Sequence, residues 1–154
     1  MSLLDATDPA PPSKIRRYVI FGIIAAVAVY LIASLIAREM LLKSQEQVVE
    51  NFLNSVVAGN MQQAYQLWQP TASYSQKDFE DDWGPNGYYG PVKSYKVDSS
   101  FEPRRSTSDV AVRVLLSPYQ PFPKNDTMEQ NKTKSVTIWV NRTTHSLSTG
   151  PPGM

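Results

Sequence analysis

Hydrophobic positions form three successive patterns along the chain, and the first is an unbroken apolar run over residues 18–37 that contains no charged side chain. A helix of about 20 residues spans roughly 30 Å, the thickness of a bilayer's hydrocarbon core. The run predicts a transmembrane helix within residues 14–40. An uncleaved signal anchor is favoured over a cleaved signal peptide because the run is longer than a typical signal-peptide core.

The second pattern is an amphipathic stripe that continues beyond Arg38 with apolar residues spaced three and four apart. Its members are Leu41, Leu42, Val48, Val49, Phe52, Leu53, Val56 and Val57. This spacing is typical of a helix packed on a core. Neither proline nor glycine occurs between Ile23 and Ala58, so we expect the membrane helix to continue into this one, with Gly59 just beyond its C-terminus.

Two shorter helices are predicted next. The first covers residues 61–68, with Asn60 as its cap. The second follows Ser75, which stands three residues before Asp78 in the arrangement of a capping box. Its apolar residues, Phe79 and Trp83, are four positions apart and share one helix face.

The third pattern is the alternation of apolar and polar residues that begins after the turn-rich sequence GPNGYYGP, residues 84–91. It predicts strands over residues 92–101, 109–117 and 134–142, and a short fourth strand over residues 145–149. In the first strand, Tyr95, Val97 and Phe101 are expected on one face. The connection over residues 118–133 is polar and rich in proline, and we expect a mobile hairpin loop there.

These patterns predict an α+β fold with one N-terminal transmembrane helix. The expected organisation is a disordered tail over residues 1–13, the membrane helix over 14–40, a domain over 41–149 and a C-terminal tail over 150–154. Lys14, Arg16 and Arg17 precede the apolar run, whereas Arg38 and Lys43 follow it. By the positive-inside rule this asymmetry favours a cytoplasmic N-terminus and an extracytoplasmic domain.

Small residues within the apolar run form two pairs four positions apart, Gly22 with Ala26 and Ala33 with Ala37. Such spacing allows membrane helices to approach closely, so these four residues are candidates for helix packing. In a segment this rich in alanine the spacing also arises by chance.

The composition excludes several kinds of chemistry. The net charge is +1, and the chain has no cysteine and a single histidine, His145. Thiol nucleophiles, iron–sulfur clusters and thiolate zinc sites are therefore excluded, and a site built from several histidines is excluded as well. We expect no cofactor, no metal and no nucleic-acid partner, since Arg104 and Arg105 alone are too few for a basic patch.

Candidate catalytic groups are few. Asp78 and Asp82 are four positions apart and can share a helix face as a carboxylate pair, although acidic residues early in a helix more often complement its dipole. His145 has no identifiable partner for general base catalysis. We therefore assign no catalytic residue and expect a protein that is not an enzyme.

Aromatic residues are concentrated over residues 65–89. The candidates for binding a ligand or a partner are Tyr65, Trp68, Phe79, Trp83, Tyr88 and Tyr89. The alternative is that they form an ordinary core. Tyr88 and Tyr89 are the strongest candidates, because adjacent residues in a turn are difficult to bury together.

The segment VVENFLNSVVAGNMQQAYQLWQP, with Gly59-Asn60 followed by Ala64-Tyr65, resembles the opening of cystatin-like, nuclear transport factor 2-like domains. The next segment, SYSQKDFEDDW…GPVKSYKV, resembles the third helix and first long strand of membrane-anchored bacterial members that have no assigned function. The resemblance covers about residues 45–145. It implies three helices packed on a curved antiparallel sheet of three to four strands. It also implies a cone whose open end can hold a small hydrophobic ligand, and a few members of the family are enzymes.

Together these features predict a non-enzymatic, single-pass protein of a bacterial cell membrane. Its extracytoplasmic domain is expected to contact a neighbouring membrane protein, as an accessory subunit of a membrane complex, or a second copy of the chain. Its other partner is the lipid bilayer. One alternative is a domain that binds a small hydrophobic ligand in a cone-shaped pocket, and a remoter one is an isomerase- or hydrolase-type enzyme.

Overall fold

The computed structural model describes residues 14–103, 108–123 and 127–150. The chain divides into two compact units, Met1–Glu39 and Met40–Met154, which are described separately. The tail predicted over residues 1–13 lies outside the described residues, as does most of the tail predicted at the C-terminus.

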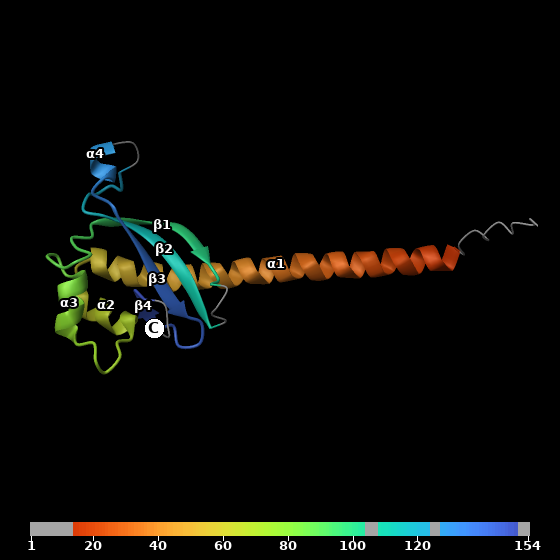
Figure 1. Ribbon diagram of the computed structural model, residues 1–154, viewed down its shortest axis with the longest axis horizontal. Helices are drawn as coiled ribbons and strands as arrows, with labels where there is room; N and C mark the ends of the chain where they lie inside the picture. Colours follow the sequence, from red (N-terminus) through yellow and green to blue (C-terminus); the bar gives the residue numbers. More distant parts are fainter. Residues whose placement is uncertain (1–13, 104–107, 124–126, 151–154) are drawn as a thin grey trace, which may run out of the picture. The chain divides into compact units, whose positions relative to one another are not determined.

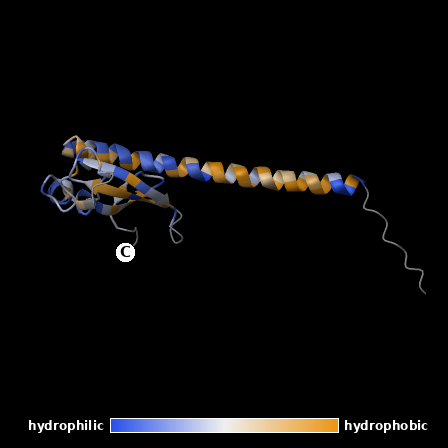
Figure 2. Ribbon diagram, turned by 90° about the horizontal axis from the view of Figure 1, so that it is seen from above, coloured by the Kyte–Doolittle hydropathy of each residue, from blue (hydrophilic) through white to orange (hydrophobic). Residues whose placement is uncertain are grey.

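Helix α1, Lys14–Val57, accounts for all the described residues of the first unit and begins the second. Its continuity agrees with the lack of proline and glycine between Ile23 and Ala58. Figure 2 shows the change in hydropathy along it, from a mostly hydrophobic first part to a more hydrophilic second part. The apolar part has the length and composition to cross a membrane. A signal sequence near an N-terminus has the same two properties.

Helices α2, Met61–Trp68, and α3, Gln76–Trp83, begin at caps that the sequence indicates. Gly59 follows α1 with φ +75°, a left-handed conformation that glycine adopts without steric cost. Before α3, the Ser75 hydroxyl accepts the Asp78 amide hydrogen at 3.2 Å, and Asp78 Oδ2 accepts the Ser75 amide hydrogen at 2.9 Å. This reciprocal pair is the predicted capping box.

The four strands form one antiparallel sheet in the order β1-β2-β3-β4 (Figure 1). Their bounds are Ser94–Phe101 for β1, Asp109–Ser117 for β2, Lys134–Asn141 for β3 and Leu147–Ser148 for β4. The α+β class and the antiparallel sheet are thus confirmed. The short fourth strand pairs only at Trp139 with Ser148 and at Val140 with Leu147.

The predicted position of Phe101 is wrong. Tyr95 and Val97 pair with Leu116 and Val114, whose side chains are buried in the core, but the register shifts between Val97 and Ser99. This bulge adds one residue to β1 and reverses the alternation beyond it. Phe101 therefore lies on the opposite face of the sheet, where it is 38% exposed.

The connection between β2 and β3 contains a short helix that the sequence analysis did not predict. Helix α4, Thr127–Gln130, stands at the end of the sheet where β2 finishes and β3 begins (Figure 1). Residues 124–126 of this connection lie outside the described residues, so its mobility stays a prediction.

One face of the sheet and the second part of α1 form the core of the Met40–Met154 unit. Phe52 of α1 lies at its centre, with ring centroids 5.0 Å from Trp68, 6.1 Å from Phe79 and 4.9 Å from Trp83. The strands contribute an apolar row that is also buried: Val110, Val112, Val114, Leu116, Val136, Ile138 and Val140. Burial of this apolar surface is the main favourable contribution to folding.

Candidate functional site

The six aromatic candidates fall into two groups. Trp68, Phe79 and Trp83 are 6% exposed or less and belong to the core. Tyr65 packs against it, and its hydroxyl donates to the Tyr74 carbonyl at 2.8 Å. For these four residues the structure matches the ordinary-core alternative.

Tyr88 and Tyr89 belong to the turn over residues 84–91, which we name the Tyr88 turn, and they differ in exposure. Tyr88 is 73% exposed. Tyr89 is partly buried and packs on Trp83 with ring centroids 4.6 Å apart, and its ring also meets that of Tyr88 edge-on at 4.9 Å. The exposed Tyr88 ring thus continues an aromatic series that begins in the core.

Backbone hydrogen bonds hold the Tyr88 turn against α3. The Tyr88 amide donates to the Asp81 carbonyl at 2.9 Å, and the Tyr89 amide donates to the Asp82 carbonyl at 2.8 Å. Gly90 closes the turn, since a Cβ atom there would lie 2.0 Å from the Gly84 carbonyl oxygen. Only glycine permits this approach of two backbone segments.

Lys134, the first residue of β3, supplies a positive charge beside the turn. Its ammonium donates to the Tyr88 carbonyl at 2.6 Å and lies 5.8 Å from the Tyr88 ring centroid, within range of a cation–π contact. In the part of the chain that the structure describes, no carboxylate forms an ion pair with Lys134. The ammonium has three N–H donors and also donates to the Gly90 carbonyl at 3.5 Å, so one donor is left over from these two contacts for an acidic group.

A groove of about 500 Å³ adjoins this pair, and we name it the β3 groove. It is lined by Tyr88, Tyr89, Lys134, Ser135, Val136, Thr137 and Thr149. Aromatic faces, one ammonium and several hydroxyls converge there, a combination suited to a peptide or protein surface.

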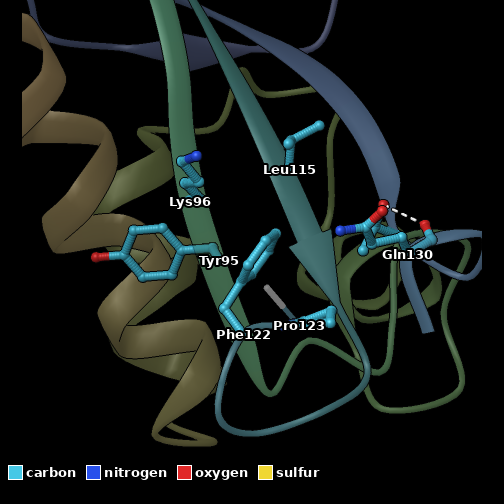
Figure 3. A pocket seen from close by; sticks show the side chains of 7 residues that line it. Tyr95, Lys96, Leu115, Phe122, Pro123 and Gln130 are labelled. Atoms are coloured by element: carbon cyan, nitrogen blue, oxygen red, sulfur yellow. Dashed lines mark hydrogen bonds between the residues drawn. The ribbon is translucent and has the colours of Figure 1, made fainter. Parts of the chain in front are cut away.

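A second groove, the Phe122 groove, has a volume of about 590 Å³ and lies between β1, β2 and the connection to β3. Figure 3 shows the Phe122 ring beside Tyr95 and Pro123, while Tyr95 points toward α1. The Tyr95 hydroxyl donates to Asn54 Oδ1 of α1 at 2.8 Å. The apolar side chains make this groove a candidate for a small hydrophobic ligand.

The acidic residues of α3 have separate structural contacts. Asp78 completes the capping box, and the hydrogen bonds from the Ser75 hydroxyl and amide lower its pKa. Asp82 accepts a hydrogen bond from the Tyr74 hydroxyl at 2.6 Å, and the pKa of Tyr74 is raised by burial and by this carboxylate. The predicted pair of Asp78 and Asp82 therefore has two different sets of partners.

His145 is exposed in the turn between β3 and β4, with φ 59°, and its amide donates to the Asn141 carbonyl at 2.8 Å. Among the described residues no group of three or more His, Asp or Glu side chains is placed to hold a metal ion. Arg104 and Arg105 lie outside the described residues.

In the apolar part of α1, a Cβ atom at Gly22 would have open space within 4 Å. The packing role of Gly22, Ala26, Ala33 and Ala37 stays a prediction, since it concerns a second helix.

Lys134, Thr137 and Thr149 in the β3 groove, and Leu115 and Phe122 in the Phe122 groove, are not among the site residues that the sequence predicts. Lys134 follows Tyr88 by 46 positions, and only the pairing of the strands brings them together. The alternation along β3 was the one available signal, and it indicates faces rather than neighbours. No protein-family model, curated protein or solved structure in our comparisons matches the chain.

Proposed function

We propose that the chain is a non-enzymatic, single-pass membrane protein whose Met40–Met154 unit binds another membrane protein through the Tyr88 turn. One observation carries the proposal: a tyrosine that is 73% exposed stands on a turn closed by Gly90 and hydrogen-bonded to α3. A rigid aromatic side chain supplies contact area at little entropic cost, which is why tyrosine is enriched at binding hot spots.

The remaining parts of the proposal concern the membrane. The apolar segment serves as an uncleaved anchor, supported by its length over residues 18–37. The basic residues Lys14, Arg16 and Arg17 support a cytoplasmic N-terminus and an extracytoplasmic domain. The resemblance to membrane-anchored bacterial members supports a bacterial cell membrane. A domain anchored in the membrane meets neighbouring membrane proteins repeatedly, so the anchor and the orientation support the role of an accessory subunit. We also propose that the domain is cystatin-like, as its resemblance indicates, and such a domain is consistent with this role.

Isolation of the full chain in mild detergent tests the proposal. Tyr88→Ala is compared with Gln66→Ala, which removes an exposed side chain from α2. Because Tyr88 is mostly exposed, its removal is expected to cost less than about 1 kcal/mol of folding free energy. A hot-spot tyrosine contributes 2 kcal/mol or more to binding, which is a loss of roughly 30-fold in affinity.

The expected result is a stoichiometric second protein with the unchanged chain and with Gln66→Ala, and its loss with Tyr88→Ala. Recovery of the chain alone contradicts the proposal. So does recovery of the same partner in equal amount with Tyr88→Ala.

A second candidate is a domain that binds a small hydrophobic ligand, and the Phe122 groove favours it specifically. Its volume of about 590 Å³ falls within the range of small-molecule sites, and Lys96 at its border suits an anionic head group. Native mass spectrometry of the full chain with a fatty acid distinguishes the two functions. Under this alternative, binding is lost in Leu115→Glu and is unaffected in Tyr88→Ala.

A further inference from the structure

The β3 groove follows an open edge of the sheet. β4 pairs with β3 only at Trp139 and Val140, so the part of β3 from Lys134 to Thr137 has β2 on one side and no strand on the other among the described residues. Beyond Ser148 the chain reaches Gly150, Pro151 and Pro152, and proline has no N–H to continue a ladder.

The direction of the free backbone groups follows from the hydrogen bonds at the other end of β3. The Asn141 amide donates to the Ser146 carbonyl at 3.0 Å, and the Asn141 carbonyl accepts from the His145 amide at 2.8 Å. Both groups of Asn141 therefore point toward β4. Residues two apart in a strand direct their backbone groups to the same edge, so those of Ser135 and Thr137 point to the open edge.

We infer that the partner inserts an extended segment along this edge as an added strand, antiparallel to β3. The inference rests on the proposed function and specifies how the same site binds. Such strand addition obtains affinity from main-chain hydrogen bonds and specificity from alternate side chains.

The walls of the groove define the chemistry of the added segment. Lys134 and Val136 lie on the same face of β3, because they are two positions apart. An antiparallel partner strand runs in the opposite direction, so its residue opposite Val136 comes two positions before its residue opposite Lys134. We call these two partner residues the first and the second position. The first position adjoins Val136 and Tyr89 and takes an apolar side chain. The second position adjoins the ammonium of Lys134 and takes an aspartate or glutamate.

The partner is therefore a protein with an accessible extended segment of pattern apolar-x-acidic. The charge at Lys134 excludes a segment with lysine or arginine at the second position, since like charges opposite each other destabilise strand pairing.

Hydrogen exchange on the full chain, alone and in the complex isolated with its partner, tests this binding mode. The expected result is that the Ser135 and Thr137 amides exchange at least tenfold more slowly in the complex than in the free chain. Thr137→Pro, which removes one edge donor, should abolish the complex, whereas Thr137→Ala keeps the donor and should retain it. Lys134→Glu should also abolish the complex, and Lys134→Arg should preserve it.

Thermal unfolding of each variant identifies any that fail to fold, and the exchange measurement on the unchanged chain does not depend on them. A complex in which both amides exchange as fast as in the free chain overturns strand addition and leaves the proposed function standing. Protection of both amides already in the free chain also overturns it, because the edge is then occupied by the chain itself. Failure to obtain any complex contradicts the proposed function and this inference with it.

Discussion

Substitution of Gly90 by alanine tests whether the Tyr88 turn is as tightly closed as its backbone indicates. The added Cβ atom would lie 2.0 Å from the Gly84 carbonyl oxygen, more than an ångström closer than ordinary van der Waals contact. Both sides of this contact are backbone, so the two ends of the turn must separate. The bonds from the Gly90 amide to the Gly87 carbonyl, 3.1 Å, and from the Gly87 amide to the Gly84 carbonyl, 2.9 Å, are then weakened or lost.

The cost follows from these contacts. Two hydrogen bonds contribute about 1 kcal/mol each, and overpacking adds roughly 1–3 kcal/mol. A total of about 3–5 kcal/mol is a large part of the roughly 5–15 kcal/mol that stabilises a typical domain, and it corresponds to a melting temperature lower by roughly 10–30 °C.

Thermal unfolding of the detergent-solubilised chain, followed by the fluorescence of its tryptophans, measures the change. Gly150→Ala is the matched control, because a Cβ atom at Gly150 meets nothing within 4 Å, and its melting temperature should be unchanged. If Gly90→Ala melts within 2 °C of the unchanged chain, the turn accommodates the methyl group. The rigidity on which the Tyr88 site depends would then be refuted.

Three further predictions concern the cap of α3 and the apolar run over residues 18–37. Ser75→Ala should lower the free energy of unfolding by roughly 0.5–2 kcal/mol through loss of the cap, and an unchanged denaturation midpoint would contradict this role. The pKa of Asp78 is lower in the folded chain than in the unfolded chain. The Asp78 carboxylate therefore stabilises the fold at a pH above its ordinary pKa, and this stabilisation is lost as the pH falls through the pKa of the folded chain. The difference in stability between the unchanged chain and Asp78→Asn should therefore shrink below about pH 4, and a constant difference would refute this linkage. The mature protein should retain residues 18–37 by mass spectrometry and resist carbonate extraction from membranes; a chain lacking them would show a cleaved signal sequence.

The local elements were largely predictable because their signals are local. The bounds of α2 and β2 agree with the apolar spacing, and the cap of α3 follows from Ser75 and Asp78. The face of Phe101 was not predictable, because a single extra residue at Asp98 reverses the alternation in β1. An aspartate at that position is also compatible with the solvent-facing side of a regular strand, so it does not by itself mark a bulge. Helix α4, with four residues, is too short to show a helical period.

The candidate site was predictable only in part. Because Tyr88 and Tyr89 are adjacent in a turn, they were not expected to be buried together. In the structure Tyr88 is exposed and Tyr89 is partly buried, which agrees with that expectation. Lys134 and the open edge of β3 depend on strand pairing between residues far apart in the chain. The early end of β4 is the one part of this arrangement with a sequence signal, the Pro151-Pro152 pair.

Contact between the Tyr88 turn and another membrane protein can be measured by site-specific photocrosslinking in intact membranes. A benzophenone amino acid replaces Tyr88 in one variant and Gln66, exposed on α2, in the other. We expect one covalent adduct of defined mass from position 88 and none from position 66. No adduct from position 88, or the same adducts from both positions, would contradict this contact.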